Sequence, residues 1–295
     1  MPTRRIRLVP RTPYIGTPVG EDLACQSGAP SLFTSGGTSN NPYTTTVVTL
    51  DDITQTEMST AGFSGTSDAD LTFPTAATDS AVSDFTRTVA GSVARIRFPT
   101  TLTVGSSTVN AQLAHTGSLG VYLDFDLLVS SNWYGHSTSG VGKLFYVTGG
   151  TVAAAPFYVS VQGTTTNSLA LQVRTQDCPP GKGGAAPGST SFNVPETVSL
   201  TRGVKRRIEI QAVMNSVDGS NNAVEDGTLK IWADGTLVCN RSTMAYRGAD
   251  TGVNGVKQTG LFNALKMTTI YGGSGGVNPP ADQYLYVGYL KLARS

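Results

Sequence analysis

Histidine is scarce in this chain of 295 residues, which contains His115 and His136 and no other imidazole. A zinc site commonly takes several His or Cys ligands, but the three cysteines lie far apart in sequence and form no CxxC pair. A Ser-His-Asp triad would also lack the GxSxG turn that exposes such a serine. We therefore predict no metal and no cofactor, and we consider proton transfer by other side chains.

Several polar residues have the types that a polysaccharide lyase requires. Such an enzyme removes the proton next to a uronate carboxylate, which takes a base and a cationic or amide group to stabilise the carboxylate. Under this hypothesis the base is His136 or Tyr158. The carboxylate is then held by Arg174 or Gln172. Further residues of suitable type are Lys143 and Arg207.

Two carboxylates, Asp124 and Asp126, alternate along one expected strand. A retaining glycosidase needs two carboxylates ~5 Å apart, but alternating Asp residues more often form a solvated strand face, which we predict here. Residues 218–222 are similar to a calcium loop. Because Ala223 stands where such a loop needs Gly, we predict a turn instead.

Four aromatic residues could stack on sugar rings, since an aromatic face offers apolar area with a polar edge. In a carbohydrate-binding protein we expect them to be exposed along a groove, although Trp232 suits core packing equally well. The candidate residues are Trp133, Tyr134, Tyr158 and Trp232.

Alternating apolar and polar residues predict the strands that must position these side chains. The pattern is clearest over residues 119–129, where it is typical of a strand with one buried face. The pair Asp234-Gly235 predicts a two-residue hairpin, and no segment has a sustained helical period. The Gly- and Pro-rich residues 175–196 predict a long loop. Similar strand patterns cover residues 157–162, 168–174, 204–214, 229–234 and 283–293.

Composition agrees with many short strands joined by turns, because charged residues make up only 14% of the chain and Gly accounts for 34 residues. We predict an all-β protein with a two-sheet antiparallel β-sandwich of the jelly-roll type. Residues 46–295 would form the sandwich. Residues 1–45, rich in Pro and Gly, would form an extended N-terminal arm.

The second part of the chain, from Leu119 to Ser295, contains a set of short motifs. They are Asn132-Trp133-Tyr134-Gly135-His136, Gly142-Lys143-Leu144-Phe145-Tyr146, Thr201-Arg202-Gly203, residues 227–235 and residues 282–287. With these motifs the chain resembles concanavalin A-like lectin and glucanase sandwiches, especially phage and bacterial proteins near the alginate-lyase-like and heparin-lyase members. The resemblance implies a jelly roll, a fold that hosts lectins, hydrolases, lyases and structural domains. The Arg-rich strand and QxH strand of those lyases have no recognisable counterpart here.

We therefore predict a non-catalytic structural or adhesive protein of a virion (capsid decoration or phage tail component) or of a surface assembly, with or without glycan binding. The alternatives are a polysaccharide lyase and a stand-alone lectin. We expect a homo-oligomer that contacts other protein subunits through residues 1–45. The net charge of +1 argues against nucleic acid, and no apolar stretch reaches the ~20 residues of a membrane span. With no Sec signal peptide expected, the predicted location is a virion or the extracellular space after synthesis in the cytoplasm.

Overall fold

The computed structural model describes residues 39–88, 90–137, 140–149, 156–164, 168–251, 257–258, 260–272 and 276–295. Within this part of the chain strands dominate and the helices are short. In chain order the elements are β1 (Thr45–Leu50), α1 (Gln55–Thr60), β2 (Leu71–Thr72), η1 (Ser80–Asp84), β3 (Ala94–Phe98), β4 (Ser107–Ser118), β5 (Gly120–Val129), β6 (Val141–Gly149), β7 (Phe157–Gln162), β8 (Leu169–Thr175), β9 (Phe192–Asn193), β10 (Val198–Leu200), β11 (Arg206–Val213), β12 (Gly227–Ala233), β13 (Thr236–Met244), β14 (Gly248–Thr251), β15 (Lys257–Gln258), β16 (Phe262–Ile270) and β17 (Gln283–Arg294).

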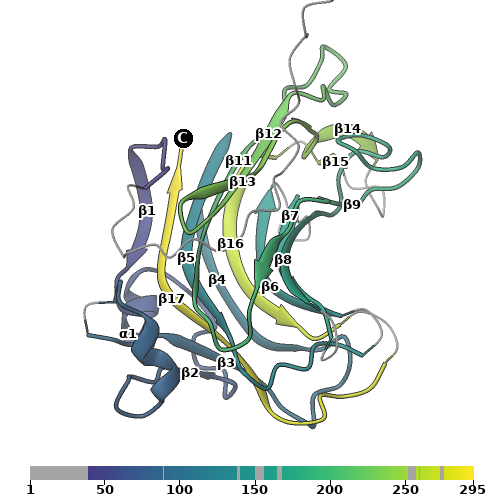
Figure 1. The fold of residues 1–295 in the computed structure, drawn as a ribbon. Helices are drawn as coiled ribbons and strands as arrows, with labels where there is room; N and C mark the ends of the chain where they lie inside the picture. Colours follow the sequence, from purple (N-terminus) through teal and green to yellow (C-terminus); the bar gives the residue numbers. More distant parts are fainter. Residues whose placement is uncertain are drawn as a thin grey trace, which may run out of the picture.

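The described strands form two large antiparallel sheets, called sheet A and sheet B here, and a small pair of β14 and β15 (Figure 1). Sheet A has the order β13-β12-β11-β5-β17-β3-β2, and β1 joins it by pairing with β17. Sheet B has the order β10-β8-β7-β6-β16-β4, and β9 pairs with β8. Figure 1 shows the strands of sheet B bending so that their hollow side faces away from sheet A. The prediction of a two-sheet antiparallel sandwich is therefore confirmed.

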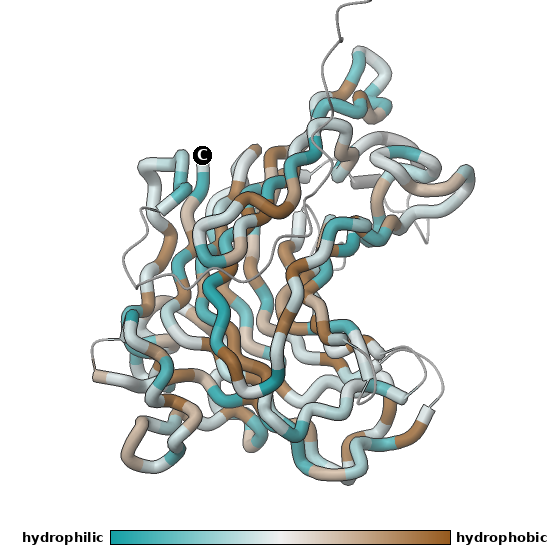
Figure 2. The backbone as a smooth tube through the Cα atoms, viewed as in Figure 1, coloured by the Kyte–Doolittle hydropathy of each residue, from teal (hydrophilic) through white to brown (hydrophobic). Residues whose placement is uncertain are grey.

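The core lies between the two sheets because apolar side chains alternate along the strands. On β8, Leu171 and Val173 point into the core, whereas Gln172 between them points to the opposite face. Hydrophobic and hydrophilic residues alternate in the same way along other strands (Figure 2). Phe125 of sheet A meets Phe145 of sheet B edge-on, with ring centroids 5.0 Å apart. Such aromatic pairs join the two layers.

The period-2 segments of the sequence correspond to β5, β7, β8, β11, β12 and β17. The predicted hairpin joins β12 to β13, and both of its turn residues have positive φ angles, 48° at Asp234 and 81° at Gly235. A two-residue turn with positive φ at both positions twists in the same right-handed sense as the strands on either side of it. The prediction that β5 has one solvated face was wrong, because every residue of β5 is buried.

The N-terminal arm predicted for residues 1–45 is described only from residue 39 onward, so residues 1–38 lie outside the described residues. Residues 39–44 precede β1 and contact sheet A of the same chain. The backbone N–H of Asn40 donates to Glu209 on β11 over 2.9 Å, and Ser39 Oγ lies 3.1 Å from the hydroxyl oxygen of Tyr122 on β5. In the described ranges, no helix is long and apolar enough to cross a membrane.

Candidate functional site

Polar side chains form a row across the outer face of sheet B, the face that points away from the core. The antiparallel register places Tyr158 of β7 opposite Tyr146 of β6 on one side and opposite Arg174 of β8 on the other. Neighbouring strands are ~4.8 Å apart, so the whole row extends over roughly 24 Å. In spatial order the row consists of Gln112, Lys266, Tyr146, Tyr158, Arg174 and Asn193.

A cavity of about 350 Å³ opens where Tyr158 and Arg174 meet in this row. Its volume falls in the range of small-molecule sites. The long loop that follows β8 forms one wall, and Gly272, just after β16, contributes to another. The Gly- and Pro-rich loop predicted from the sequence therefore borders the cavity. The lining residues are Val141, Lys143, Tyr158, Arg174, Gln176, Asp177, Thr190, Ser191 and Gly272.

A β-bulge places Lys143 on the same face as the two tyrosines. The register between β6 and β7 shifts between Lys143 and Phe145, so Lys143 and Tyr146 both point outward although they are three residues apart. Lys143 Nζ lies 4.8 Å from the ring centroid of Tyr158 and 5.5 Å from that of Tyr146. The two tyrosine rings are themselves 5.4 Å apart. The ammonium group therefore lies beside both rings.

Burial gives this lysine and this tyrosine shifted pKa values. Desolvation, together with the positive charge of Arg174, lowers the pKa of Lys143 from the ordinary value of 10.5. Desolvation raises the pKa of Tyr158 above 10.0, and the Arg174 guanidinium opposes that rise. Lys143 thus releases its proton more readily than an exposed lysine does, and Tyr158 holds its proton more firmly than an exposed tyrosine.

Arg174 is fixed at the wall of the cavity by a hydrogen bond in which its Nη2 donates to Ser191 Oγ over 3.0 Å. The carboxylate of Asp177 also lines the cavity, and Gln176 Nε2 donates to it over 3.3 Å. Two cationic side chains therefore share the cavity with one carboxylate among its lining residues. This balance favours a ligand that carries negative charge.

Two of the residues predicted for lyase chemistry do not line this cavity. Gln172 lies on the same face in the neighbouring row, but its amide donates to the carbonyl of Val194 over 3.3 Å. The His136 ring is fully buried, with its centroid 5.2 Å from the Tyr271 ring. It lies directly behind Gly272, where an added side-chain carbon would come within 2.3 Å of it. In this structure His136 is thus a packing residue behind the cavity wall.

No family model and no curated protein sequence matches the chain. Solved structures do resemble it. The alginate lyase Aly36B superposes with a TM-score of 0.52 at 16% identity, over 86% of this chain and 94% of its own. An endo-β-1,4-glucuronan lyase from the fungus Trichoderma reesei gives 0.48 at 10% identity, over 87% and 92%. An alginate lyase from Chlorella virus gives 0.47 at 13% identity, over 70% and 87%.

The chain has the concanavalin A-like jelly-roll fold. This agrees with the resemblance drawn from the sequence. The comparison contradicts the prediction that the protein is not an enzyme, because an enzyme, the alginate lyase Aly36B, has the same jelly roll. At these identities the likeness establishes the fold, and activity has to be argued from the residues of this chain.

The aromatic residues predicted to bind sugar do not line one groove of the jelly roll. The Trp133 ring is fully buried edge-on against Phe98, with centroids 5.2 Å apart, which leaves no ring face for a sugar. Tyr134 is half-buried, and its backbone N–H donates to Gln283 over 2.6 Å. Trp232 is half-buried on the outer face of sheet A, because its neighbours on β12 point into the core. Tyr158 alone of the four lines the cavity on sheet B.

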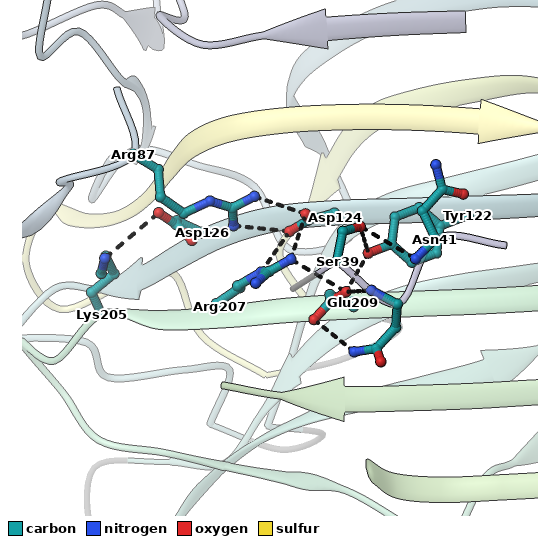
Figure 3. A network of polar contacts seen from close by, with 10 residues as sticks. Ser39, Asn41, Arg87, Tyr122, Asp124, Asp126, Lys205, Arg207 and Glu209 are labelled. Atoms are coloured by element: carbon teal, nitrogen blue, oxygen red, sulfur yellow. Dashed lines mark hydrogen bonds and ion pairs between the residues drawn. The ribbon is translucent and has the colours of Figure 1, made fainter. Parts of the chain in front are cut away.

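The carboxylates that might have formed a glycosidase pair belong to a polar network on the outer face of sheet A (Figure 3). Arg87 bonds to Asp124 over 2.7 Å and to Asp126 over 2.9 Å. Arg207 bridges Asp124 and Glu209 over 3.0 and 3.3 Å. The prediction that the two aspartates are solvated was wrong, since they are 1% and 0% exposed. Nowhere in the described residues are three or more His, Cys, Asp or Glu side chains placed to hold a metal ion.

Some residues of the site had no signal in the sequence analysis. Tyr146 and Lys266 were not singled out, because only the strand register reveals that they continue the row through Tyr158. Lys143 was named by residue type, but strand alternation does not place it beside Tyr158. Arg207, named with it, belongs to the network on sheet A instead.

Proposed function

We propose that the protein is a polysaccharide lyase that cleaves a uronate-containing polymer in the cavity on sheet B. The observation that carries the proposal is the convergence of Lys143, Tyr158 and Arg174 in one cavity. A base, a hydroxyl acid and a cation for the carboxylate are the groups that β-elimination next to a uronate carboxylate requires. The shared fold supports this proposal, since the alginate lyase Aly36B is built on the same sandwich.

The pKa shifts decide how we assign the two proton-transfer roles. Lys143, with its pKa lowered by burial and by Arg174, has a neutral form that is more accessible and serves as the base. Tyr158, with its pKa raised by burial, keeps the proton that a general acid donates. These directions favour the reverse of the role that the sequence analysis gave to Tyr158. Arg174 then binds the uronate carboxylate and stabilises the charge that develops on it.

The reaction requires no group beyond these side chains. Lys143 Nζ takes the proton from the carbon next to the carboxylate, and the electrons of that C–H bond form a carbon–carbon double bond. The bond from the neighbouring carbon to the glycosidic oxygen breaks, and this oxygen takes the proton of the Tyr158 hydroxyl. The products are a shortened chain and a fragment with an unsaturated uronate at its new end. Proton return from the lysine to the tyrosine, directly or through water, restores the site.

The row across sheet B supports a polymer as the substrate rather than a small acid. At the ~4.8 Å strand spacing it extends over roughly 24 Å, beyond the three neighbouring strands that carry Lys143, Tyr158 and Arg174. Lys266 lies opposite Tyr146 on the other side from Tyr158, so cations flank the two tyrosines along the row. We propose that the polymer lies along this row, across the strands, with successive carboxylates near Arg174 and Lys266.

The test is an assay of the full chain on alginate and on polyglucuronate, with the ultraviolet absorbance of the unsaturated product as the signal. We expect activity on at least one of these polymers and a loss of activity in Lys143→Ala. Lys230→Ala is the matched control, because Lys230 is a half-buried lysine on the outer face of sheet A, far from the cavity. Absence of product with both polymers, or equal loss of activity in both lysine variants, would refute the proposal.

A further inference from the structure

A second cavity, of about 430 Å³, lies on the outer face of sheet A, on the opposite side of the sandwich from the proposed active site. Its lining residues come from η1 and the residue before it, from the end of β5 and the segment that follows, from the turn before β11 and from β17. The proposed lyase chemistry involves none of them. They are Asp79, Ser80, Ala81, Leu128, Ser130, Ser131, Asn132, Gly203, Tyr284 and Tyr286.

The floor of this cavity is an apolar and aromatic platform. Leu128 pairs with Tyr286 across β5 and β17, and both belong to a small hydrophobic cluster on the outer face, separate from the core between the sheets. Tyr284, two residues along β17, is half-buried, with its ring centroid 6.2 Å from that of Tyr286. Tyr286 is 5% exposed and supports Tyr284 from below, so the half-buried Tyr284 ring, with the Arg95 guanidinium 5.3 Å from its centroid, is the aromatic face for stacking.

The walls of the cavity are polar, and the carboxylate among them already has hydrogen-bond partners within the chain. Asp79 is the charged residue among those lining the cavity, and its Oδ2 accepts from Arg95 over 3.0 Å and from the Tyr286 hydroxyl over 2.9 Å. Its Oδ1 accepts from the backbone N–H of Ala81 over 3.1 Å. Ser80, Ser131 and Asn132 are exposed at the rim, where the Asn132 amide nitrogen donates to the carbonyl of Asp282 over 2.7 Å.

We propose that this cavity binds an uncharged pyranose unit of a polysaccharide. A sugar ring combines an apolar face, which would stack on Tyr284, with hydroxyls that would bond to the rim. The charged residue among those lining this cavity is a carboxylate, Asp79, so none of them attracts a uronate, in contrast to Lys143 and Arg174 in the cavity on sheet B. The proposal does not depend on the lyase activity, because it uses a different face and different residues.

Isothermal titration calorimetry of the full chain tests it, with hexasaccharides of β-linked glucose, mannose and xylose, and a uronate hexasaccharide for comparison. We expect binding of at least one uncharged oligosaccharide, and a rise of about tenfold or more in Kd in Tyr284→Ala. Ser131→Trp, a change at an exposed position, fills the cavity and should abolish the same binding while thermal unfolding stays unchanged. Trp232→Ala is the control, since it removes another half-buried aromatic from the same sheet face.

The outcomes separate the alternatives. Failure of every uncharged oligosaccharide to bind would overturn the proposal, as would binding that Trp232→Ala reduces but Tyr284→Ala and Ser131→Trp leave intact. Binding of the uronate alone, lost in Arg174→Met, would assign all recognition to the cavity on sheet B. Loss of uncharged-sugar binding in the two cavity variants, with uronate cleavage unchanged, would confirm a separate site.

Discussion

The outer faces of the two sheets both carry charged side chains that are partly or fully withdrawn from water, yet they arrange these charges differently. On sheet A, the carboxylates Asp124, Asp126 and Glu209 bond to arginine and lysine side chains of the same chain (Figure 3). On sheet B, Lys143 and Arg174 lie close enough for Arg174 to lower the pKa of Lys143. The first arrangement is neutralised within the chain, whereas the second favours an anion from outside.

Burial also shifts the pKa of a carboxylate on sheet A and the pKa of an ammonium group on sheet B in opposite directions. On sheet A, desolvation raises the pKa of Asp126, and Arg87 and Lys205 oppose that rise. A buried carboxylate of this kind depends on its cations, because removing one partner leaves an uncompensated charge. On sheet B, desolvation instead eases proton release from Lys143. Changes on sheet A should therefore reduce stability, and changes on sheet B should reduce activity.

The largest expected effect is on catalysis, in Tyr158→Phe. Removal of the hydroxyl takes away the general acid, which should lower kcat by roughly 10²–10⁴-fold. The free energy of unfolding in urea should change by less than about 1 kcal/mol, because the ring remains. If Tyr158→Phe lost unfolding free energy in proportion to its loss of activity, Tyr158 would support the fold rather than the reaction, contrary to the contrast between the two sheets.

The next effect is on stability, in Arg87→Met. Asp124 and Asp126 would lose the guanidinium that bonds to both, so we expect a loss of about 3–5 kcal/mol of unfolding free energy in urea titrations. The activity of the folded fraction should stay at the level of the unchanged protein. Arg174→Met is the matched comparison, for which the account predicts lost activity with little lost stability. Reversed results for the two arginines would contradict it.

A smaller effect should appear in the pH dependence of kcat for Arg174→Gln. The rising limb follows deprotonation of Lys143 and lies below 10.5, and the falling limb follows deprotonation of Tyr158 above 10.0. Because Arg174 lowers both pKa values, its removal should shift both limbs to higher pH, by about one unit or less. Limbs that stay in place, or move to lower pH, would show that other groups control the profile.

The smallest effect concerns the segment that covers the network. Asn40 donates its side-chain N–H to Glu209 over 3.2 Å in addition to its backbone N–H. Asn40→Ala keeps the backbone bond and loses the other, so it should cost roughly 1–2 kcal/mol in urea titrations. Thr44→Ala, at an exposed position of the same segment, serves as the control, because the Asn41 side chain itself accepts a hydrogen bond from the Tyr43 N–H over 3.0 Å. Equal effects of the two changes would mean that the contact with Glu209 contributes nothing specific.

Part of this structure could be predicted from the sequence because the strands are strongly patterned. Valine, leucine and phenylalanine alternate with polar residues along β7 and β8, so the pattern placed Tyr158, Gln172 and Arg174 on one outward face. The jelly-roll fold followed from the number of such segments and from the turn at Asp234-Gly235. Strands such as β4 escaped prediction because alanine and threonine weaken its pattern.

The rest depended on contacts that periodicity does not encode. Simple alternation puts Lys143 and Tyr146 on opposite faces, and the bulge on β6 brings them together. The burial of Asp124 depends on its hydrogen bonds with Arg87, which lies in a loop 37 residues earlier in the chain. His136 had suitable chemistry but lies behind Gly272, an exclusion that follows from loop packing. The predicted subunit contacts through residues 1–45 and the predicted location stay predictions.

The most direct test of the central claim is the structure of the products that the full chain releases from a uronate polymer in isotope-labelled water. The account predicts an unsaturated uronate at each new non-reducing end. With ¹⁸O as the label, neither product end should carry an oxygen from water, because elimination breaks the C–O bond without adding water. Saturated products that carry the label would establish hydrolysis instead, and they would contradict the roles assigned to Lys143, Tyr158 and Arg174.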